Sequence, residues 1–383
     1  MQDAMISSSS LATDALFAPF EMGPLQLANR FVLAPMTRCF SPGGVPGADV
    51  AAYYRRRAEA GVGLLITEGT WIPHPAASNE ENAPRFYGED ALAGWSHVLS
   101  EVHAAGGKII PQLWHTGLTR KRKVEFLYDK AEEDLSLKVS PSGYVLEDEK
   151  AGEGMSDAEI EDLIEAYAVA AESAERLGFD GFEIHGAHGY MVDQFFWSGT
   201  NHRSDRWGGA QISERVRFGV EVVRRCRSRV SANFPILFRF SQWKLQNYGA
   251  RIAASPAELA AWLEPLADAG VDIFHASQRR FWEPEFPDSD MNLAGWAKKL
   301  TGKPSITVGS VGLDQTFLES FVSRDSAEVA NLDRLIQMFD RGDFDLVAVG
   351  RALLQDHTWV EKVKRGSLDE LQPFNAESMA TLY

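Results

Sequence analysis

Two histidines and a tyrosine lie close together in the stretch EIHGAHGYMVDQFF, which covers residues 183–196. His185 and His188 are three residues apart, and Tyr190 follows two residues later. Two imidazoles with this spacing could begin a zinc site, or they could hold one substrate oxygen between two N–H donors. The tyrosine could then give that substrate a proton. The simplest alternative is that each histidine only satisfies nearby backbone groups.

A metal site at these histidines needs further ligands. His115, His275 and Glu68 also fall near the ends of predicted strands, but other carboxylates that could complete a zinc site are lacking there. We therefore predict no metal. A metal-dependent hydrolase or lyase that uses His185 and His188 stays open as an alternative of a different class.

Two glycine-containing pairs predict an anion site elsewhere in the chain. Gly309-Ser310 closes the run SITVGS, and Gly350-Arg351 closes the run LVAVGR. Glycine lets backbone N–H groups come close to a phosphate, and an arginine can pair with it through two hydrogen bonds. The two pairs indicate a phosphorylated cofactor or substrate.

Arg239 lies inside the apolar run PILFRFS. An unpaired guanidinium is costly among apolar side chains. Arg239 therefore either pairs with a buried carboxylate or faces a bound anionic group.

Short apolar runs alternate with longer helix-like stretches along the whole chain. Continuous runs of this length are typical of strands that are covered on both faces. In the stretch 156–178, Ser156 and Glu159 form a predicted capping box, and the stretch 255–270 begins with a serine cap and a proline. The runs predicted as strands are 31–36, 63–69, 108–115, 181–187, 235–241, 272–277, 305–310 and 346–351.

Eight such alternations predict an α/β fold made of one (β/α)8 TIM barrel. A doubly wound sheet is the competing architecture, but no GxGxxG motif follows the first run. We expect a flexible leader at residues 1–16 and the barrel over residues 17–383. A hairpin within residues 16–30 should close the bottom of the barrel. An excursion at residues 116–155 follows the third strand on the face where barrel active sites lie, and there it could act as a lid.

The composition excludes several classes of protein. The formal net charge is −16, and the one short basic run, TRKRKVEF, is soon followed by acidic residues, which argues against a nucleic-acid binder. No apolar segment is long enough to cross a membrane. Two cysteines are too few for a four-thiolate iron-sulfur cluster and suit a reducing cytoplasm. We therefore expect a cytoplasmic enzyme, which could also assemble with copies of itself.

These residues together resemble the old yellow enzyme family of FMN-dependent ene-reductases. The resemblance runs over nearly the whole chain, through the blocks NRFVLAPMTR, ITEGT, PQLWH, FDGFEIHGAHGYMVDQFF, TNHRSDRWGGAQISERVRFGVEVV and LVAVGRALLQD. It implies a non-covalently bound FMN that is reduced by NADH or NADPH. Two related activities stay open, a flavin dehydrogenase and an enoyl or dienoyl reductase on the same barrel. A binding protein without catalysis is a more distant alternative.

The resemblance also implies a role for individual residues around the flavin. Pro35, Met36 and Gly69 would approach it by backbone, and Thr37 would offer a hydroxyl near the C4 carbonyl. The hydrogen-bonding and phosphate-binding positions would be Gln112, His185, Arg239, Gly309, Ser310, Gly350 and Arg351.

The same resemblance places the substrate at the histidines. His185 and His188 would bind the carbonyl of an activated alkene, and Trp114 would shape the pocket. Hydride would pass from flavin N5 to the β-carbon, and Tyr190 would protonate the α-carbon, because an unperturbed tyrosine, with a pKa of about 10, carries its proton at neutral pH. Trp282, Arg279 and Arg280 follow the sixth predicted strand, and the sequence gives them no role.

Overall fold

Eight parallel strands form a closed barrel in this computed structural model, as the sequence predicts. The structure describes residues 13–78, 80–121, 139–316, 319–320 and 326–383. Around the barrel the strands follow the order β10-β11-β12-β3-β4-β5-β8-β9. They are β3 (Phe31–Leu33), β4 (Leu64–Trp71), β5 (Ile109–Trp114), β8 (Phe182–His188), β9 (Ile236–Lys244), β10 (Ile273–Ser277), β11 (Ser305–Val308) and β12 (Leu346–Val349).

The strands are apolar on both faces because both faces are covered. Side chains such as Leu64, Ile110 and Leu237 pack against one another in the cluster that fills the barrel interior. The alternate side chains, such as Leu65 and Phe238, belong to the larger cluster between the strands and the surrounding helices. This double burial explains why the strands read as unbroken apolar runs.

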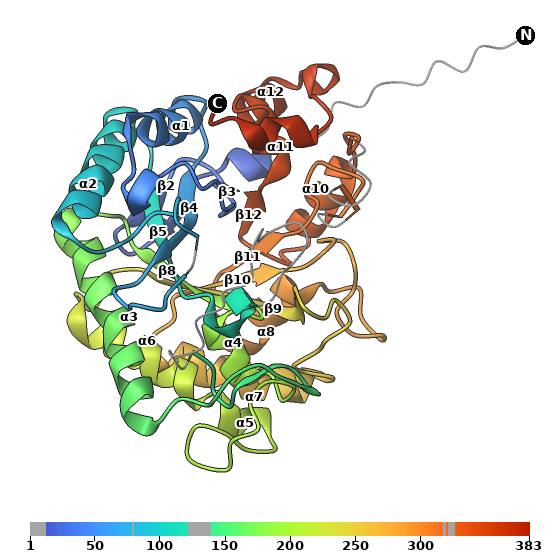
Figure 1. Cartoon of the computed structure of the whole chain (residues 1–383). Coiled ribbons are helices and arrows are strands. Elements are labelled where there is room, and N and C mark those ends of the chain that lie inside the picture. The colour runs from blue at the N-terminus through green and yellow to red at the C-terminus, as the bar shows by residue number, and fades with distance from the viewer. Residues whose placement is uncertain (1–12, 79, 122–138, 317–318, 321–325) are drawn as a thin grey trace, which may run out of the picture.

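Helices surround the barrel, with α1, α2, α3 and α6 along one side in Figure 1. The described α-helices are α1 (Ala48–Glu59), α2 (Glu89–Ala104), α3 (Asp157–Leu177), α4 (Met191–Phe196), α5 (Ile212–Arg215), α6 (Arg217–Arg229), α7 (Pro256–Ala269), α8 (Leu293–Thr301), α10 (Leu332–Asp340), α11 (Arg351–Gln355) and α12 (Trp359–Arg365). Short 3-10 helices occupy Asp14–Phe17 (η1), Pro42–Gly44 (η2), Gly117–Lys121 (η3), Leu368–Glu370 (η4) and Ala376–Ala380 (η5). Within the described residues, none of the helices combines the length and the apolar character needed to span a bilayer.

The predicted helix ends are confirmed. The Ser156 hydroxyl accepts a hydrogen bond from the Glu159 backbone N–H, and the Glu159 carboxylate accepts one from Ser156 N–H, which completes the capping box of α3. Gly178 ends that helix in the left-handed conformation. Ser255 caps α7, where Pro256 is the first helical residue.

A hairpin of β1 (Phe20–Met22) and β2 (Leu25–Leu27) precedes the first barrel strand. Its buried side chains Phe20, Leu25 and Leu27 join the cluster inside the barrel, so the hairpin closes the bottom as expected. Most of the expected leader lies at residues 1–12, outside the described residues. Its last part is packed, because η1 buries Leu16, which is 2% exposed.

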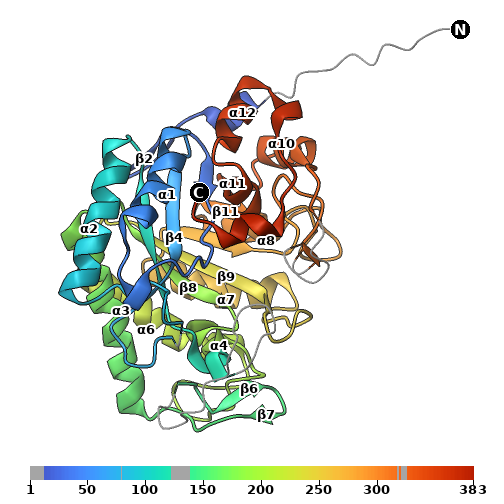
Figure 2. The same ribbon diagram turned by 45° about the horizontal axis from the view of Figure 1, so that its top comes forward.

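The excursion after β5 carries a two-stranded hairpin of β6 (Tyr144–Leu146) and β7 (Glu149–Lys150), seen at the end of the molecule near α4 in Figure 2. Arg203 donates hydrogen bonds to the carbonyls of Pro141 and Met155 and so holds the base of this hairpin. Residues 122–138 lie outside the described residues. None of the described residues of the excursion borders the cavity discussed below, and its role as a lid stays a prediction.

Candidate active site

One cavity opens at the carboxyl ends of the barrel strands, where active sites of this architecture lie. Every residue that the sequence assigns to the site borders it. These residues are Pro35, Met36, Thr37, Gly69, Gln112, Trp114, His185, His188, Tyr190, Arg239, Gly309, Ser310, Gly350 and Arg351.

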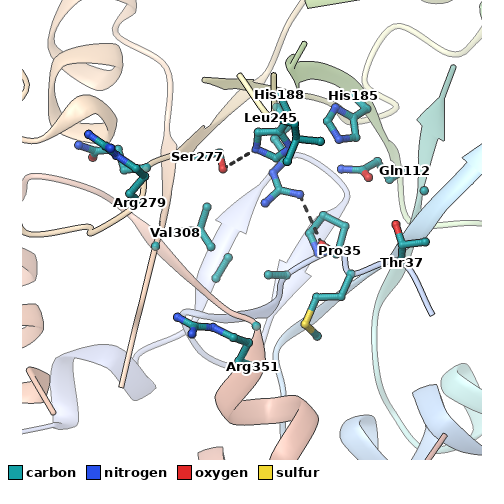
Figure 3. A pocket seen from close by; sticks show the side chains of 18 of the residues that line it. Pro35, Thr37, Gln112, His185, His188, Leu245, Ser277, Arg279, Val308 and Arg351 are labelled. Carbon is teal, nitrogen blue, oxygen red and sulfur yellow. Dashed lines mark hydrogen bonds between the residues drawn. The ribbon is translucent and has the colours of Figure 1, made fainter. Parts of the chain in front are cut away.

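The cavity is polar at two separated places. Figure 3 shows His185, His188 and Gln112 at one side and Arg351 at the other, with Pro35 between them. This arrangement suits an elongated ligand that has a ring at one end and an anionic group at the other.

His185 is held as a neutral hydrogen-bond donor. Its Nδ1 accepts a hydrogen bond from the backbone N–H of Ala187 at 3.3 Å, so the proton of the neutral ring is on Nε2. Burial, with a further contribution from the Arg239 charge, lowers the pKa of His185 well below its usual value. His185 therefore offers an Nε2–H donor to the cavity without carrying a charge.

His188 is held in place by its backbone conformation and by three contacts. Its φ of 66° lies in the left-handed region, which costs a non-glycine residue on the order of 1–3 kcal/mol. Its backbone N–H donates to Ser241 Oγ at 2.9 Å, and its ring stacks on Trp243 with centroids 4.4 Å apart. Its Nε2 lies 2.8 Å from Ser277 Oγ, a contact drawn in Figure 3.

The contact with Ser277 bears on which nitrogen of His188 could serve as a donor to the substrate. The two-donor clamp needs one N–H from each histidine, and Nε2 of His188 has the Ser277 hydroxyl as a partner. A serine hydroxyl can donate as well as accept. If it donates to Nε2, the proton of His188 is on Nδ1, and that N–H becomes the second donor of the clamp.

Tyr190 lies against His185 and Trp114, with ring centroids 4.9 and 5.3 Å away and 6% of its surface exposed. A buried ion pair fixes the segment that carries it. Lys244 Nζ is 2.9 Å from the carboxylate of Asp193, both side chains are fully buried, and that carboxylate also accepts the N–H of Gly189. The tyrosine is therefore held beside the histidine that it is expected to assist.

The contacts of Arg239 favour the second of the two expectations stated for it, a bound anionic group. It is 7% exposed and forms no ion pair with any described carboxylate. One nitrogen lies 3.5 Å from the Pro35 carbonyl oxygen, and its Nε has no hydrogen-bond partner among the described residues. Burial lowers the pKa of Arg239. A buried guanidinium that has so few hydrogen bonds within the described residues is suited to bind a group that carries negative charge.

Arg351 provides a second guanidinium that forms no ion pair with a carboxylate of the described residues. It is 8% exposed and donates to Ser310 Oγ at 3.3 Å and to the carbonyls of Thr316 and Gln315. Burial lowers its pKa to about 10, so it keeps its positive charge at neutral pH. These contacts hold the guanidinium in place, but their acceptors are neutral, so a bound anion would be needed to balance its charge.

The glycines of the site are required for different reasons. A Cβ on Gly309 would stand 2.4 Å from the Gln278 carbonyl oxygen, so the close approach of the segments that follow β10 and β11 requires glycine there. A Cβ on Gly69 would stand 2.9 Å from the Trp114 ring. At Gly350 the nearest atom would be Met36 Sδ at 3.4 Å, so a side chain there would project into the cavity.

Several cavity residues were not predicted. Trp243, Leu245 and Tyr248 come from the end of β9 and the turn after it, and Ser277 ends β10. The signal available in the sequence was the two-residue period of β10, which places Ser277 on the same face as His275. Of the residues left without a role, Arg279 borders the cavity.

Arg280 and Trp282 do not border this cavity. Arg280 pairs with the carboxylates of Glu283 and Glu319. The Trp282 ring packs against Phe281.

The other histidines considered as metal ligands have protein partners. His115 lies 3.1 Å from His74, and His275 lies 2.6 Å from the Glu183 carboxylate. Among the residues that the structure describes, no three or more histidine, cysteine, aspartate or glutamate side chains are grouped so that they could hold a metal ion.

The model of one protein family matches nearly the whole chain. Residues 15–370 match the NADH:flavin oxidoreductase / NADH oxidase family. This chain belongs to that family, the old yellow enzymes.

Two relatives and one solved structure show how far the similarity extends. The chain is 39% identical to 12-oxophytodienoate reductase 7 of Oryza sativa subsp. japonica over 57% of its own length and 56% of that protein. It is 30% identical to NADH oxidase of Thermoanaerobacter brockii over 93% of its length and 52% of that protein. The match thus spans about half the length of these two relatives. The structure of morphinone reductase in complex with tetrahydroNAD superimposes with a TM-score of 0.76 and 25% identity, covering 95% of this chain and 94% of that one.

The cavity of this old yellow enzyme fits FMN, the cofactor of the family. Arg239 and Gln112 are the buried polar groups at one end, where the flavin ring would lie. Arg351, with the open space at Gly350, would hold the phosphate at the other end.

The fit predicts that Arg351→Met weakens FMN binding about 10- to 100-fold, because a charged hydrogen bond contributes roughly 1.5–3 kcal/mol. Riboflavin lacks the phosphate, so its affinity should change much less. Titration of each flavin into apoprotein, followed by flavin fluorescence, measures both. Arg280→Met, which removes a guanidinium that is already paired with two carboxylates, should bind FMN like the wild type. An equal loss for FMN and riboflavin would contradict the assignment.

The lowered pKa values of the histidines predict how stability depends on pH. The unfolded chain takes up protons on His185 and His188 near their ordinary pKa of 6.5, whereas the native protein does not. The free energy of unfolding should therefore fall as the pH drops from about 7.5 to about 5.5. Urea denaturation should show a shallower slope for His185→Gln. An unchanged slope in His185→Gln would refute the prediction.

Proposed function

We propose that this chain is an FMN-dependent ene-reductase that uses NADH or NADPH to reduce an alkene activated by a carbonyl group. The observation that carries the proposal is the pair of His185 and Tyr190, with rings 4.9 Å apart, at the end of the cavity where Gln112 and Arg239 lie. Relatives named as reductases and a neighbouring structure that holds tetrahydroNAD support it. When bound, FMN would take a hydride from the nicotinamide and deliver it from N5 to the β-carbon.

The histidines would bind and polarise the substrate carbonyl. His185 Nε2–H is fixed in place before the substrate arrives, because Ala187 N–H occupies the other ring nitrogen. His188 supplies the second donor once Ser277 donates to its Nε2. Donors fixed in this way stabilise the negative charge that develops on the carbonyl oxygen as hydride arrives.

Tyr190 would then complete the reduction. Its hydroxyl gives a proton to the α-carbon as the enolate collapses, and solvent returns the proton to the phenolate. Trp114 and the ion pair of Lys244 with Asp193 keep the tyrosine at the carbonyl clamp. The alkene is thus reduced by one hydride and one proton.

Anaerobic titration of the purified protein tests the proposal. The protein should be yellow with an FMN spectrum, NADH or NADPH should bleach it, and cyclohexenone should restore the oxidised spectrum. A colourless protein, or a flavin that no enone reoxidises, would overturn the proposed function.

Tyr190→Phe separates the two half-reactions. Loss of a general acid slows its step about 10²- to 10⁴-fold, so stopped-flow measurements should show slow enone reduction with nearly unchanged flavin reduction. Tyr167→Phe is the matched control, because its hydroxyl is buried in α3, away from the cavity, without a hydrogen-bond partner among the described residues. Equal slowing of both half-reactions in Tyr190→Phe would count against a proton-donor role.

A further inference from the structure

A row of polar side chains crosses the inside of the barrel under one end of the cavity. Gln112, Glu183, Arg239 and His275 come from β5, β8, β9 and β10, which are consecutive neighbours in the barrel. Gln112 pairs in register with Glu183, and Arg239 pairs with His275. Two positions earlier on β5, β9 and β10 lie Ile110, Leu237 and Ile273, which belong to the apolar cluster that fills the barrel interior. The polar row therefore separates this cluster from the cavity.

Glu183 is the centre of the row. Its side chain is fully buried, and each carboxylate oxygen has one partner: Gln112 Nε2 at 2.7 Å and His275 Nδ1 at 2.6 Å. Burial lowers the pKa of His275, which keeps that imidazole neutral. The carboxylate thus accepts hydrogen bonds from two neutral donors, and the positive charge that compensates it comes from elsewhere in the row.

Arg239 supplies that charge from the neighbouring strand. Arg239 pairs in register with His275, the side chain that contacts Glu183, so the guanidinium and the carboxylate lie in the same row on neighbouring strands. Burial lowers the pKa of Arg239, and the negative charge of Glu183 opposes that shift. They form no direct ion pair, and only Arg239 borders the cavity. A ligand at this end of the cavity therefore meets a positive charge that is partly offset by a carboxylate behind it.

Glu183 also decides which way Gln112 faces. Gln112 gives its amide N–H to the carboxylate, and the reverse orientation would bring its carbonyl oxygen against a negatively charged oxygen. The amide oxygen of Gln112 is therefore left for the cavity, where it can accept a hydrogen bond from a ring N–H.

We propose that Glu183 is a positioning residue for the flavin, which orients Gln112 and offsets the charge of Arg239, and so lowers the reduction potential of the bound cofactor. This inference rests on the proposed function. Reduction adds negative charge to the flavin edge near N1 and the C2 carbonyl, and a carboxylate behind that edge disfavours it. A lower potential makes the reduced flavin a stronger hydride donor to the alkene.

Glu183→Gln tests the inference, because it removes the charge and keeps the shape and one acceptor oxygen. We expect the variant to prefer reduced over oxidised FMN at least tenfold more than the wild type does. A tenfold change corresponds to a midpoint potential about 30 mV higher for a two-electron couple. Equilibrium reduction of the holoenzyme against a reference dye gives the potential, and a titration with oxidised FMN gives its dissociation constant.

A matched pair of variants guards against loss of folding in Glu183→Gln. Glu183→Asp and Glu183→Asn have the same size and differ in charge, so the asparagine variant should have the higher potential. Asp180→Asn is the control, because Asp180 is a carboxylate just before the other end of β8, where it pairs with Lys108. This variant should change the preference for reduced over oxidised FMN by less than twofold.

Two outcomes would overturn the inference. One is a potential in Glu183→Gln that equals or falls below that of the wild type, and the other is equal potentials in the aspartate and asparagine variants. A wild-type protein that binds no FMN would instead overturn the proposed function itself, so the two failures can be told apart.

Discussion

Pairing of β12 with β3 closes the barrel, and the arrangement of the whole site depends on it. The strands join through Val347 and Phe31, Ala348 and Val32, and Val349 and Leu33. The N–H of Ala34 then donates to the Val349 carbonyl at 3.0 Å. Closure brings the segment that follows the first strand beside the segment that follows the last, although more than 300 residues separate them in the sequence.

This closure puts the two ends of one ligand site within a single cavity. Pro35 and Met36 leave β3 next to Gly350 and Arg351, which leave β12. Because the strands are parallel, their carboxyl ends also bring the histidine clamp to the same face. The site is thus a property of the closed barrel, and no single segment of the chain could form it.

The buried cationic side chains around the cavity differ in their partners. Lys244 pairs directly with Asp193, and this pair holds the segment of the proton donor in place. Arg239 and Arg351 form no ion pair with a described carboxylate, and both border the cavity. A bound anionic group there would balance their positive charge. Unpaired buried charges are costly, so their presence on the cavity wall marks the places at which a charged ligand would bind.

The sequence by itself determined the strands, the caps of α3 and α7 and many, but not all, of the residues that border the cavity. These features follow from local patterns: continuous apolar runs, serine and glutamate three residues apart, and polar residues at strand ends. Tertiary structure alone decided the partners of those residues. Ser277 engages His188 across 89 residues, and Glu183 accepts hydrogen bonds from Gln112 and His275 across 71 and 92 residues. Such contacts exist only after the barrel closes, because a hydrogen bond depends on position in space and the sequence pattern records only position along the chain.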